Sequence, residues 1–544
     1  MFSTVIPEST ISVSPRPGRL ERTPGRIKLP IAFLLGSVLA LATPGIDMHW
    51  AAWCGLAPLI VLTRAATNRS QAFFTGLSFG AGYYAVALSF FFGLYPLSWL
   101  GVHDAFAVQL VAGIWLVEIL HYSLLFGAFS LAQFCLPMRL GFIPGHKRPY
   151  FPFMLSLPFI WIFLQWVLAP SRLFLGSPVS QLAYTQASNL PLIQVASIGG
   201  SACIDFIIVA ANCALAQIII EFSDLARRLG QRTDQLNTKI GVVFDIALIA
   251  LVVASIMSWG NSRLKRIEEE IRPERAARIS PQSPPVAVAV IQNNISIEEE
   301  KFNTVSINEL IGRLKGLTDD LGSTMVILPE GTINSDQSAP HLLKDYLRDL
   351  ADKQKKEILV GIIEPRKDNK YINGVRIFSP ANPKDDIYAK QLLTPVGESL
   401  PFVLNQVKQK SDAKNFEIKS FDASTKTKLV DSVFGDIGIA ISNEVIYPKL
   451  MADRARRGAS LFVVAANLGW FHNSSLNRQL LACATLRAVE NKRYLILATN
   501  TGISSVIDPA GVVSSRSYPL KRGVLLDTVQ FIYSKTPFTK LRWL

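Results

Sequence analysis

Apolar residues are distributed unevenly along this chain, as long segments in the first half and short runs in the second half. We predict that the long segments form an α-helical membrane domain of about seven helices over residues 29–262. These segments are 29–45, 48–64, 71–95, 104–134, 150–168, 190–221 and 241–260. Several reach the roughly 20 apolar residues that a helix needs to cross a bilayer. The first two are shorter, and we expect them to form a tight hairpin around Pro44 and Gly45.

Lysine and arginine divide the loops of this domain into two classes. Basic residues precede the first segment, follow the second and the fourth, and lie between the sixth and the seventh: Arg16, Arg19, Arg22, Arg26, Lys28, Arg64, Arg69, Arg139, Lys147, Arg148, Arg227, Arg228, Arg232 and Lys239. The intervening loops at 46–49 and 96–103 have none, and 169–189 has only Arg172. Because cytoplasmic loops are enriched in basic residues, we expect the basic arm at 1–28 in the cytoplasm. Seven crossings then place everything after about residue 262 on the extracytoplasmic side.

The second half of the chain alternates short apolar runs with amphipathic stretches, after a charged linker at 263–285. The runs have the length and β-branched content of buried strands: 286–294, 324–331, 357–365, 374–380, 436–444, 460–470 and 494–502. Helical patterns lie between them at about 304–321, 340–355, 447–457 and 476–492. Strands that alternate with helices predict an α/β sandwich over residues 286–530, with its site at the strand ends.

Composition supports a membrane protein, since hydrophobic residues make up 49% of the chain and the mean hydropathy is +0.29. The net charge of +14 invites a nucleic-acid partner, but much of it lies in the predicted cytoplasmic loops. Because no basic patch is interleaved with aromatic residues, we expect no nucleic-acid binding. Only one of the five cysteines, Cys483, lies in the second half, so the sandwich has no internal disulfide. No His/Cys cluster has the spacing of metal ligands.

Three of the strand-like runs end in residues that can carry chemistry: Glu330 in VILPEG, Lys390 in YAKQLLTPVGE and Ser442 in GIAISNE. Glu330 follows an apolar run, and partly apolar surroundings raise a carboxyl pKa toward that of a useful base. Lys390 is suited to stabilise an oxyanion, and Ser442 follows a small apolar strand entering a bend, which suits a nucleophile. Each alone is equally an ordinary turn or surface residue. Their order and spacing together indicate acyl transfer or amide cleavage.

These motifs occur with others that carry a family resemblance: ALATPG (40–45), GLAPLI (55–60), GSP…LAY…Q (176–186), IQNNI (291–295), ANLGWF (466–471) and LRAVENKRYLILATNTGISSVIDPAG (486–511). From about residue 29 to 520 the chain resembles the apolipoprotein N-acyltransferases, which join a multi-span membrane domain to a nitrilase-like, carbon-nitrogen hydrolase domain with an αββα sandwich. The resemblance implies that Glu330 is the general base, that Lys390 stabilises the oxyanion, and that Ser442 occupies the position of the catalytic cysteine.

The resemblance also assigns supporting residues. Glu398 and Glu444 match further acidic residues of the active site, and Asn443 replaces a tyrosine that is usual beside the nucleophile. A loop near the pocket is matched by Asn467, Trp470 and Phe471. Residues 531–544 are expected to form a tail without the last membrane span that is usual in the family.

The implied reaction transfers a fatty acyl chain from a phospholipid, through an acyl-enzyme, to the N-terminal amine of a diacylglyceryl-cysteine lipoprotein. The resemblance implies a bacterial inner-membrane protein without cofactor or metal, and we expect a monomer. Because a serine hydroxyl is a far weaker acid than a thiol, two alternatives stay open. They are a pseudoenzyme that binds lipid or lipoprotein without turnover, and a membrane-anchored amidase. We expect Cys483 to be a packing residue and not a substitute nucleophile.

Overall fold

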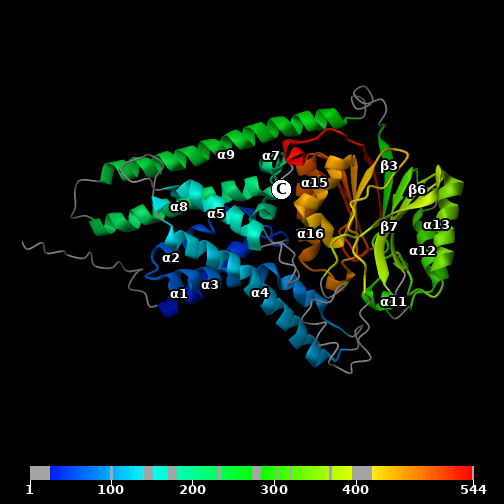
Figure 1. The fold of residues 1–544 in the computed structure, drawn as a ribbon, viewed down its shortest axis with the longest axis horizontal. Helices are drawn as coiled ribbons and strands as arrows, with labels where there is room; N and C mark the ends of the chain where they lie inside the picture. The colour runs from blue at the N-terminus through cyan, green and yellow to red at the C-terminus, as the bar shows by residue number, and fades with distance from the viewer. Residues whose placement is uncertain are drawn as a thin grey trace, which may run out of the picture.

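The computed structural model describes residues 25–97, 102–136, 138–139, 151–168, 181–228, 235–272, 284–301, 304–318, 322–366, 370–394, 398 and 420–541. Figure 1 shows two bodies side by side, a bundle of helices from the N-terminal half and an α/β sandwich from the C-terminal half. The long helix α9 runs along the bundle and ends beside the sandwich.

In the described part of the chain the bundle has seven principal helices and several short ones. Its principal helices are α1 (Gly25–Leu39), α2 (Ala57–Arg64), α3 (Arg69–Ala87), α4 (Asp104–Cys135), α5 (Phe153–Leu168), α8 (Ser201–Arg228) and α9 (Gln235–Ile271). Among the described residues, the helices long and apolar enough to cross a membrane are Asp104–Cys135, Ser201–Ile220 and Val242–Ile271. Val243 and Leu251 of α9 are 66% and 64% exposed. Such exposure of large apolar side chains on one helix is typical of a surface that faces lipid.

The second apolar segment, 48–64, does not form one continuous helix. After the turn at Gly45, where φ is +111°, the chain makes a short 3₁₀ helix and then the eight-residue α2. At 1.5 Å per residue α2 is about 12 Å long, which is too short to cross the hydrocarbon core. The break is buried because Asn212 Oδ1 of α8 accepts the N–H groups of Leu56 and Ala57, each at 2.9 Å. The two backbone N–H groups that the break leaves without a helical partner are therefore hydrogen-bonded inside the bundle.

Two sheets form the core of the sandwich. The first has the order β14-β3-β4-β6-β7-β8, with β5 beside β6, and the second has the order β13-β12-β11-β10-β9. The strands are β3 (Val286–Gln292), β4 (Met325–Ile327), β5 (Ile333–Asn334), β6 (Glu357–Pro365), β7 (Tyr371–Ser379), β8 (Asn382–Ala389), β9 (Ile437–Ile441), β10 (Leu461–Ala466), β11 (Leu495–Thr499), β12 (Ser505–Ile507), β13 (Val513–Arg516) and β14 (Gly523–Val529). Within the sheets, β3, β4 and β6 are mutually parallel, as are β9, β10 and β11.

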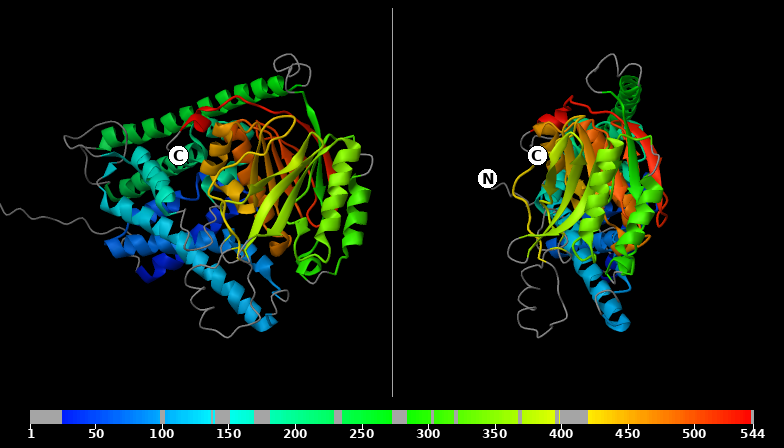
Figure 2. Two further views of the ribbon diagram at one scale, coloured as in Figure 1. Left: turned by 45° about the vertical axis from the view of Figure 1, so that its right-hand side comes forward. Right: turned by 90° about the vertical axis from the view of Figure 1, so that its right-hand side faces the viewer.

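Helices cover the outer face of each sheet. They are α11 (Ile297–Lys301), α12 (Ile307–Thr318), α13 (Pro340–Gln354), α15 (Pro448–Arg457), α16 (Leu476–Asn491) and α17 (Pro537–Lys540). The inner faces of both sheets share one buried cluster, while α12 and α13 pack on the first sheet and α15 and α16 on the second. Figure 2 shows these layers, with α15 and α16 on the side of the bundle. The αββα sandwich behind a helical membrane domain is therefore confirmed.

Two segments at the expected domain boundaries are part of the packed structure. The charged residues that begin the expected linker continue α9 as far as Ile271, and Glu270 pairs with Lys492 of the sandwich at 2.5 Å. Lys, Arg and Glu are good helix formers, so this segment extends the helix instead of ending it. The expected tail is packed as far as residue 541, since Phe531 and Phe538 are buried.

The junction between bundle and sandwich contains a buried charged cluster. Arg487 Nε lies 3.2 Å from Glu490 Oε2, and both side chains are fully buried in α16. Glu490 Oε1 accepts the N–H of Ser201, the first residue of α8, at 3.0 Å. Arg487 also donates to the hydroxyl of Tyr184 in the bundle at 3.3 Å. One carboxylate of the sandwich thus caps a membrane helix and neutralises a buried arginine.

We expect Glu490→Ala to lower the stability of the protein in detergent by about 3–5 kcal/mol, because it leaves the Arg487 charge buried without a partner. Thermal unfolding followed by circular dichroism measures the change. Asp349→Ala is the control, since Asp349 pairs with Lys353 at a surface where its side chain is 66% exposed. An unfolding temperature of Glu490→Ala equal to that of the control would show that the cluster does not hold the two bodies together.

Candidate functional site

The candidate residues lie at one edge of the sandwich, where parallel strands of both sheets end. Glu330 follows β4, Ser442 follows β9 and Asn467 follows β10. Lys390 follows β8, which runs antiparallel to β7 and therefore in the direction of β6. Strand direction alone thus brings side chains from four separate parts of the chain to the same edge.

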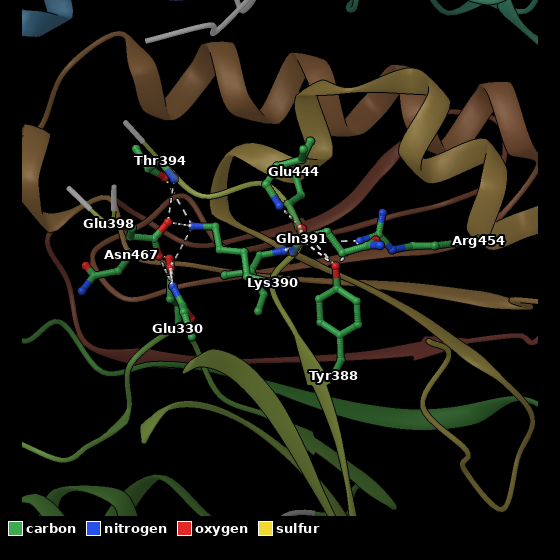
Figure 3. Close-up of polar contacts among 12 residues, drawn as sticks. Glu330, Tyr388, Lys390, Gln391, Thr394, Glu398, Glu444, Arg454 and Asn467 are labelled. Atoms are coloured by element: carbon green, nitrogen blue, oxygen red, sulfur yellow. Dashed lines mark hydrogen bonds and ion pairs between the residues drawn. The ribbon is translucent and has the colours of Figure 1, made fainter. Parts of the chain in front are cut away.

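Lys390 is the centre of a buried cluster of charges (Figure 3). Its side chain is 1% exposed, and its Nζ lies 2.8 Å from Glu398 Oε2 and 3.6 Å from Glu330 Oε1. Nζ also donates to Thr394 Oγ1 at 3.3 Å. Asn373 bridges the two carboxylates, because its Nδ2 donates to Glu330 Oε1 at 2.6 Å and to Glu398 Oε1 at 2.5 Å. Two carboxylates therefore share one ammonium and one amide.

The surroundings shift the pKa values of the two carboxyl groups in opposite directions. Burial raises the pKa of Glu330, and the attraction of Lys390 only partly opposes this effect. Burial also disfavours the charged form of Lys390, but the two carboxylates outweigh it and raise the Lys390 pKa. For Glu398, burial is outweighed by the charge and hydrogen bond of Lys390, which lower its pKa. Lys390 and Glu398 thus stay charged at neutral pH, and Glu330 is the member best able to exchange a proton.

Glu330 is also oriented by its second oxygen. Oε2 accepts the backbone N–H of Asn467 at 2.8 Å, while Oε1 is held by Asn373. Asn373 was not among the residues expected from the sequence. A polar residue inside the apolar strand β7, in YINGVRI, is the signal that points to it.

Glu444 forms a second buried cluster that fixes the chain around Ser442. Its carboxylate accepts the backbone N–H groups of Gln391 at 2.7 Å, Leu392 at 3.1 Å and Ile441 at 2.8 Å. Gln391 and Leu392 directly follow Lys390, and Ile441 directly precedes Ser442. Glu444 therefore ties the turn that carries Ser442 to the loop that carries Lys390.

Two further side chains complete the Glu444 cluster. The Tyr388 hydroxyl donates to both carboxylate oxygens at 2.8 and 3.0 Å, and Arg454 lies 3.3 Å from Oε2 and also donates to the Tyr388 hydroxyl. Arg454 and Glu444 are both fully buried. Neither Tyr388 nor Arg454 was expected from the sequence. An arginine in the amphipathic α15 has the pattern of a surface residue.

Ser442 occupies a sharp bend between β9 and the short 3₁₀ helix η7 (Ser442–Ile446). Its φ of +51° lies in the left-handed region, which is uncommon for a residue other than glycine and is often found at functional sites. Within the described part of the chain its side chain makes no hydrogen bond. Its neighbour Asn443 has a buried Oδ1 that is likewise without a hydrogen-bond partner among the described residues. The bend thus presents a hydroxyl and an amide oxygen that the described residues leave without a hydrogen bond.

The expected pocket loop lies against the helical bundle. Phe471, at the end of η8 (Gly469–Phe471), packs edge-on against Phe90 at a centroid distance of 5.7 Å, and Phe90 belongs to η3 (Ser89–Leu94) of the bundle. His472 Nδ1 lies 2.7 Å from the carbonyl oxygen of Gly93 in the same element. Trp470 is half-buried beside Phe471. The site is therefore adjacent to the apolar domain.

Cys483 does not offer an alternative nucleophile. It is fully buried in α16, and burial raises the pKa of its thiol to about 12. Because the thiolate is the reactive form, this cysteine is a packing residue, as expected from the sequence.

Comparisons with known proteins match both bodies of the structure. Residues 35–214 match the family model described as apolipoprotein N-acyltransferase N-terminal domain, and residues 287–534 match the model for carbon-nitrogen hydrolase. Apolipoprotein N-acyltransferase of Geobacter metallireducens is 28% identical over 92% of this chain and 89% of its own length. The protein of that name from Shewanella oneidensis is 25% identical over 95% of this chain and 92% of its own length. A crystal structure of a Saccharomyces cerevisiae member of branch 10 of the nitrilase superfamily covers 46% of this chain and 91% of its own, at 18% identity and a TM-score of 0.35.

Proposed function

Because this chain belongs to the apolipoprotein N-acyltransferase family, we propose that it is a membrane enzyme that moves a fatty acyl chain from a phospholipid to the N-terminal amine of a diacylated lipoprotein. The single observation that carries the proposal is the site beside the bundle. There a buried Glu330–Lys390–Glu398 cluster is tied by Glu444 to the bend that presents Ser442. The apolar bundle gives lipid substrates access to the site, and the charged cluster provides the groups for acid–base catalysis.

In the first step we propose that Ser442 Oγ attacks the carbonyl carbon of a phospholipid acyl ester. Glu330 takes the hydroxyl proton and delivers it to the glycerol oxygen as the carbon–oxygen bond breaks, which releases a lysophospholipid and leaves the acyl chain on Ser442. The raised pKa of Glu330 suits a group that first accepts and then donates a proton. Lys390, held as an ammonium by Glu398, faces the negative charge that develops on the carbonyl oxygen.

In the second step the acceptor amine attacks the acyl ester of Ser442. Glu330 takes a proton from the amine, the bond to Ser442 Oγ breaks, and the proton returns to that oxygen. The products are an N-acylated lipoprotein and free enzyme. In both steps Ser442 carries the acyl chain and Glu330 accepts and returns the proton. Neither a cofactor nor a metal ion takes part in this scheme.

We further propose that the N-terminus is cytoplasmic, that the sandwich is extracytoplasmic at a bacterial inner membrane, and that the protein acts as a monomer. The distribution of lysine and arginine between loops supports the orientation. Burial of α15 and α16 against the bundle supports the monomer, because that helical face is not free for a second copy.

A second candidate is a protein that binds lipid or lipoprotein without turnover. It is favoured by the serine itself, because efficient serine nucleophiles are usually hydrogen-bonded to a base and Ser442 has no such bond among the described residues. Asn443, a half-buried residue in place of a tyrosine, points the same way.

The purified protein in lipid nanodiscs, given a phospholipid with a labelled acyl chain and a synthetic diacylated lipopeptide, distinguishes the two candidates. We expect lysophospholipid and N-acyl lipopeptide in equal amounts, and none with Ser442→Ala. The acid limb of kcat/KM should lie above pH 4.3, about the ordinary glutamate pKa, because Glu330 must lose its proton to act as a base. Lipopeptide binding without any product from the unmodified protein would favour the binding candidate.

A further inference from the structure

A polar pocket lies beside Glu330. Four carboxylates line it, from Glu299, Glu300, Glu330 and Asp336, and no lysine or arginine is among its described lining residues. Arg313 pairs with Glu299 at 3.4 Å and with Glu309, which does not line the pocket, at 2.6 Å. Asp336 is exposed at the rim, so the pocket opens to solvent there. An anionic pocket that includes a catalytic carboxylate favours a cationic ligand.

Side-chain amides connect the pocket wall to the catalytic carboxylate. Glu300 accepts from Asn334 Nδ2 at 3.3 Å and from Asn467 Nδ2 at 3.1 Å. The backbone N–H of Asn467 donates to Glu330, and its side-chain oxygen accepts from Asn500 Nδ2 at 3.1 Å. Amide side chains both donate and accept, which suits the N–H and C=O groups of a peptide backbone.

Asn293 has a buried acceptor oxygen without a hydrogen-bond donor among the described residues, which is independent evidence for a ligand. Its side chain lines the pocket and the residue is only 4% exposed. Its Nδ2 donates to Thr332 Oγ1 at 3.2 Å, and Thr332 lines the same pocket. Its Oδ1 is buried and has no hydrogen-bond partner among the described residues. Buried acceptors in native proteins are nearly always paired, so this oxygen indicates a ligand that brings an N–H group.

We infer that this pocket holds the amino-terminal peptide of the acyl acceptor, with its α-ammonium group beside Glu330. The inference rests on the proposed function, since it names where the acceptor of that reaction binds. An α-amino group has a pKa of about 7.7–8.0 and is mostly an ammonium at neutral pH. The carboxylates attract it in this form, and Glu330 removes the proton that would otherwise prevent attack on the acyl-enzyme. Glu330 gives this first proton to Ser442 Oγ as the bond between that oxygen and the acyl carbon breaks. The Glu330 carboxylate restored in this way takes the second proton of the nitrogen as the amide forms, and that proton passes to solvent through the open pocket.

The loop after β10 joins this pocket to the bundle. Asn467 lines the pocket, and Phe471 of the same loop packs against Phe90 of the bundle at a centroid distance of 5.7 Å. The pocket is lined by residues at the ends of β3, β4, β5, β10 and β11 and by residues of α11 and α12, and it opens past Asp336. The peptide of the acceptor therefore lies in a polar pocket that one loop connects to the apolar domain, where its lipid is held. An amine without a peptide makes no contacts in the pocket, so the pocket selects the lipoprotein acceptor.

Binding and turnover test this inference separately. The probe for binding is a short synthetic peptide with a free amino terminus, titrated calorimetrically into the unmodified protein, Glu300→Gln, Asp336→Asn and the double variant. We expect each substitution to weaken binding several-fold and the pair about tenfold or more, as for loss of a hydrogen bond to a charged group. The N-acetylated peptide should bind the unmodified protein about tenfold more weakly. Glu298→Gln, on the same helix α11 but not lining the pocket, is the matched control.

In turnover, the same substitutions should raise KM for the diacylated lipopeptide by a similar factor and change kcat much less. Equal affinity for the free and N-acetylated peptides, or an unchanged KM in the double variant, would overturn the inference even if lysophospholipid is released normally. Absence of lysophospholipid from the unmodified protein would instead reject the proposed function. In that case selective binding of the free amino terminus would still place the peptide in the pocket.

Discussion

Ser442→Cys is expected to raise the rate of acyl-enzyme formation by at least two powers of ten. A thiol has a pKa of about 8.5, whereas a serine hydroxyl is a far weaker acid that depends wholly on its base. The cysteine would lie on the same strained bend, beside the loop that carries the Lys390 ammonium, and a nearby cation lowers a thiol pKa further. Release of lysophospholipid in the first turnover, followed by rapid quench, measures the change.

Labelling provides a second readout that does not depend on substrate. A thiol-directed reagent should modify Cys at position 442 faster than Cys483, which is fully buried with a thiol pKa raised to about 12. Ser442→Ala controls for labelling at the other cysteines. If Ser442→Cys has the unfolding temperature of the unmodified protein but is neither labelled nor active, the site has lost more than its nucleophile. The proposal of an enzyme would then give way to that of a lipid-binding protein.

The layered fold follows from the sequence because its central strands are buried on both faces. Such strands appear as continuous apolar runs, and β6, β9, β10 and β11 lie within the predicted runs. The strands that were not predicted are mostly at or near sheet edges, as β8, β13 and β14 are. In β13 and β14 every residue except Val529 is exposed or half-buried, so these strands lack the continuous apolar pattern of a buried strand. Edge strands are fixed by pairing with a neighbour, which local sequence does not encode.

Single residues of the site were predictable where a strand leads directly into them. Glu330 and Ser442 follow apolar strands, and Lys390 follows β8 within a recognisable motif. Asn373 and Arg454 were missed for a different reason. Asn373 acts on Glu330, which is 43 residues away, and Arg454 contacts the Tyr388 hydroxyl, which is 66 residues away, so only the fold brings these pairs together. The polar pocket was missed likewise, because its lining comes from the ends of several strands and from two helices.

Lys390→Met is expected to lower turnover by about three powers of ten or more and also to destabilise the protein. The catalytic loss follows from removal of the charge that faces the oxyanion. The loss of stability is expected because Glu398 and Glu330 would remain buried without their shared cation, and breaking a buried pair in this way costs about 3–5 kcal/mol. Lys353→Met is the control, since its side chain is 76% exposed.

A second substitution separates the two effects. Adding Glu398→Gln to Lys390→Met removes the stranded charge, so the double variant should recover most of the stability and none of the activity. Recovery of activity would mean that Lys390 only balances charge and does not act on the oxyanion.

The pH dependence of stability gives an independent check on the same pair. In the unmodified protein Lys390 lowers the pKa of Glu398, so the pair stabilises the fold above the unfolded carboxyl pKa and loses this contribution as pH falls through the lowered value. In Lys390→Met the attraction of the ammonium is lost, and we expect burial to outweigh the remaining hydrogen bonds from Thr394 and Asn373 and to raise the Glu398 pKa above the unfolded value. The carboxylate then costs stability above about pH 4.3 and costs nothing once it is protonated below that value. The difference in unfolding free energy between the two proteins should therefore be largest near neutral pH and shrink on acidification. A difference that does not change between pH 7 and pH 4 would mean that Glu398 is not the group left unpaired.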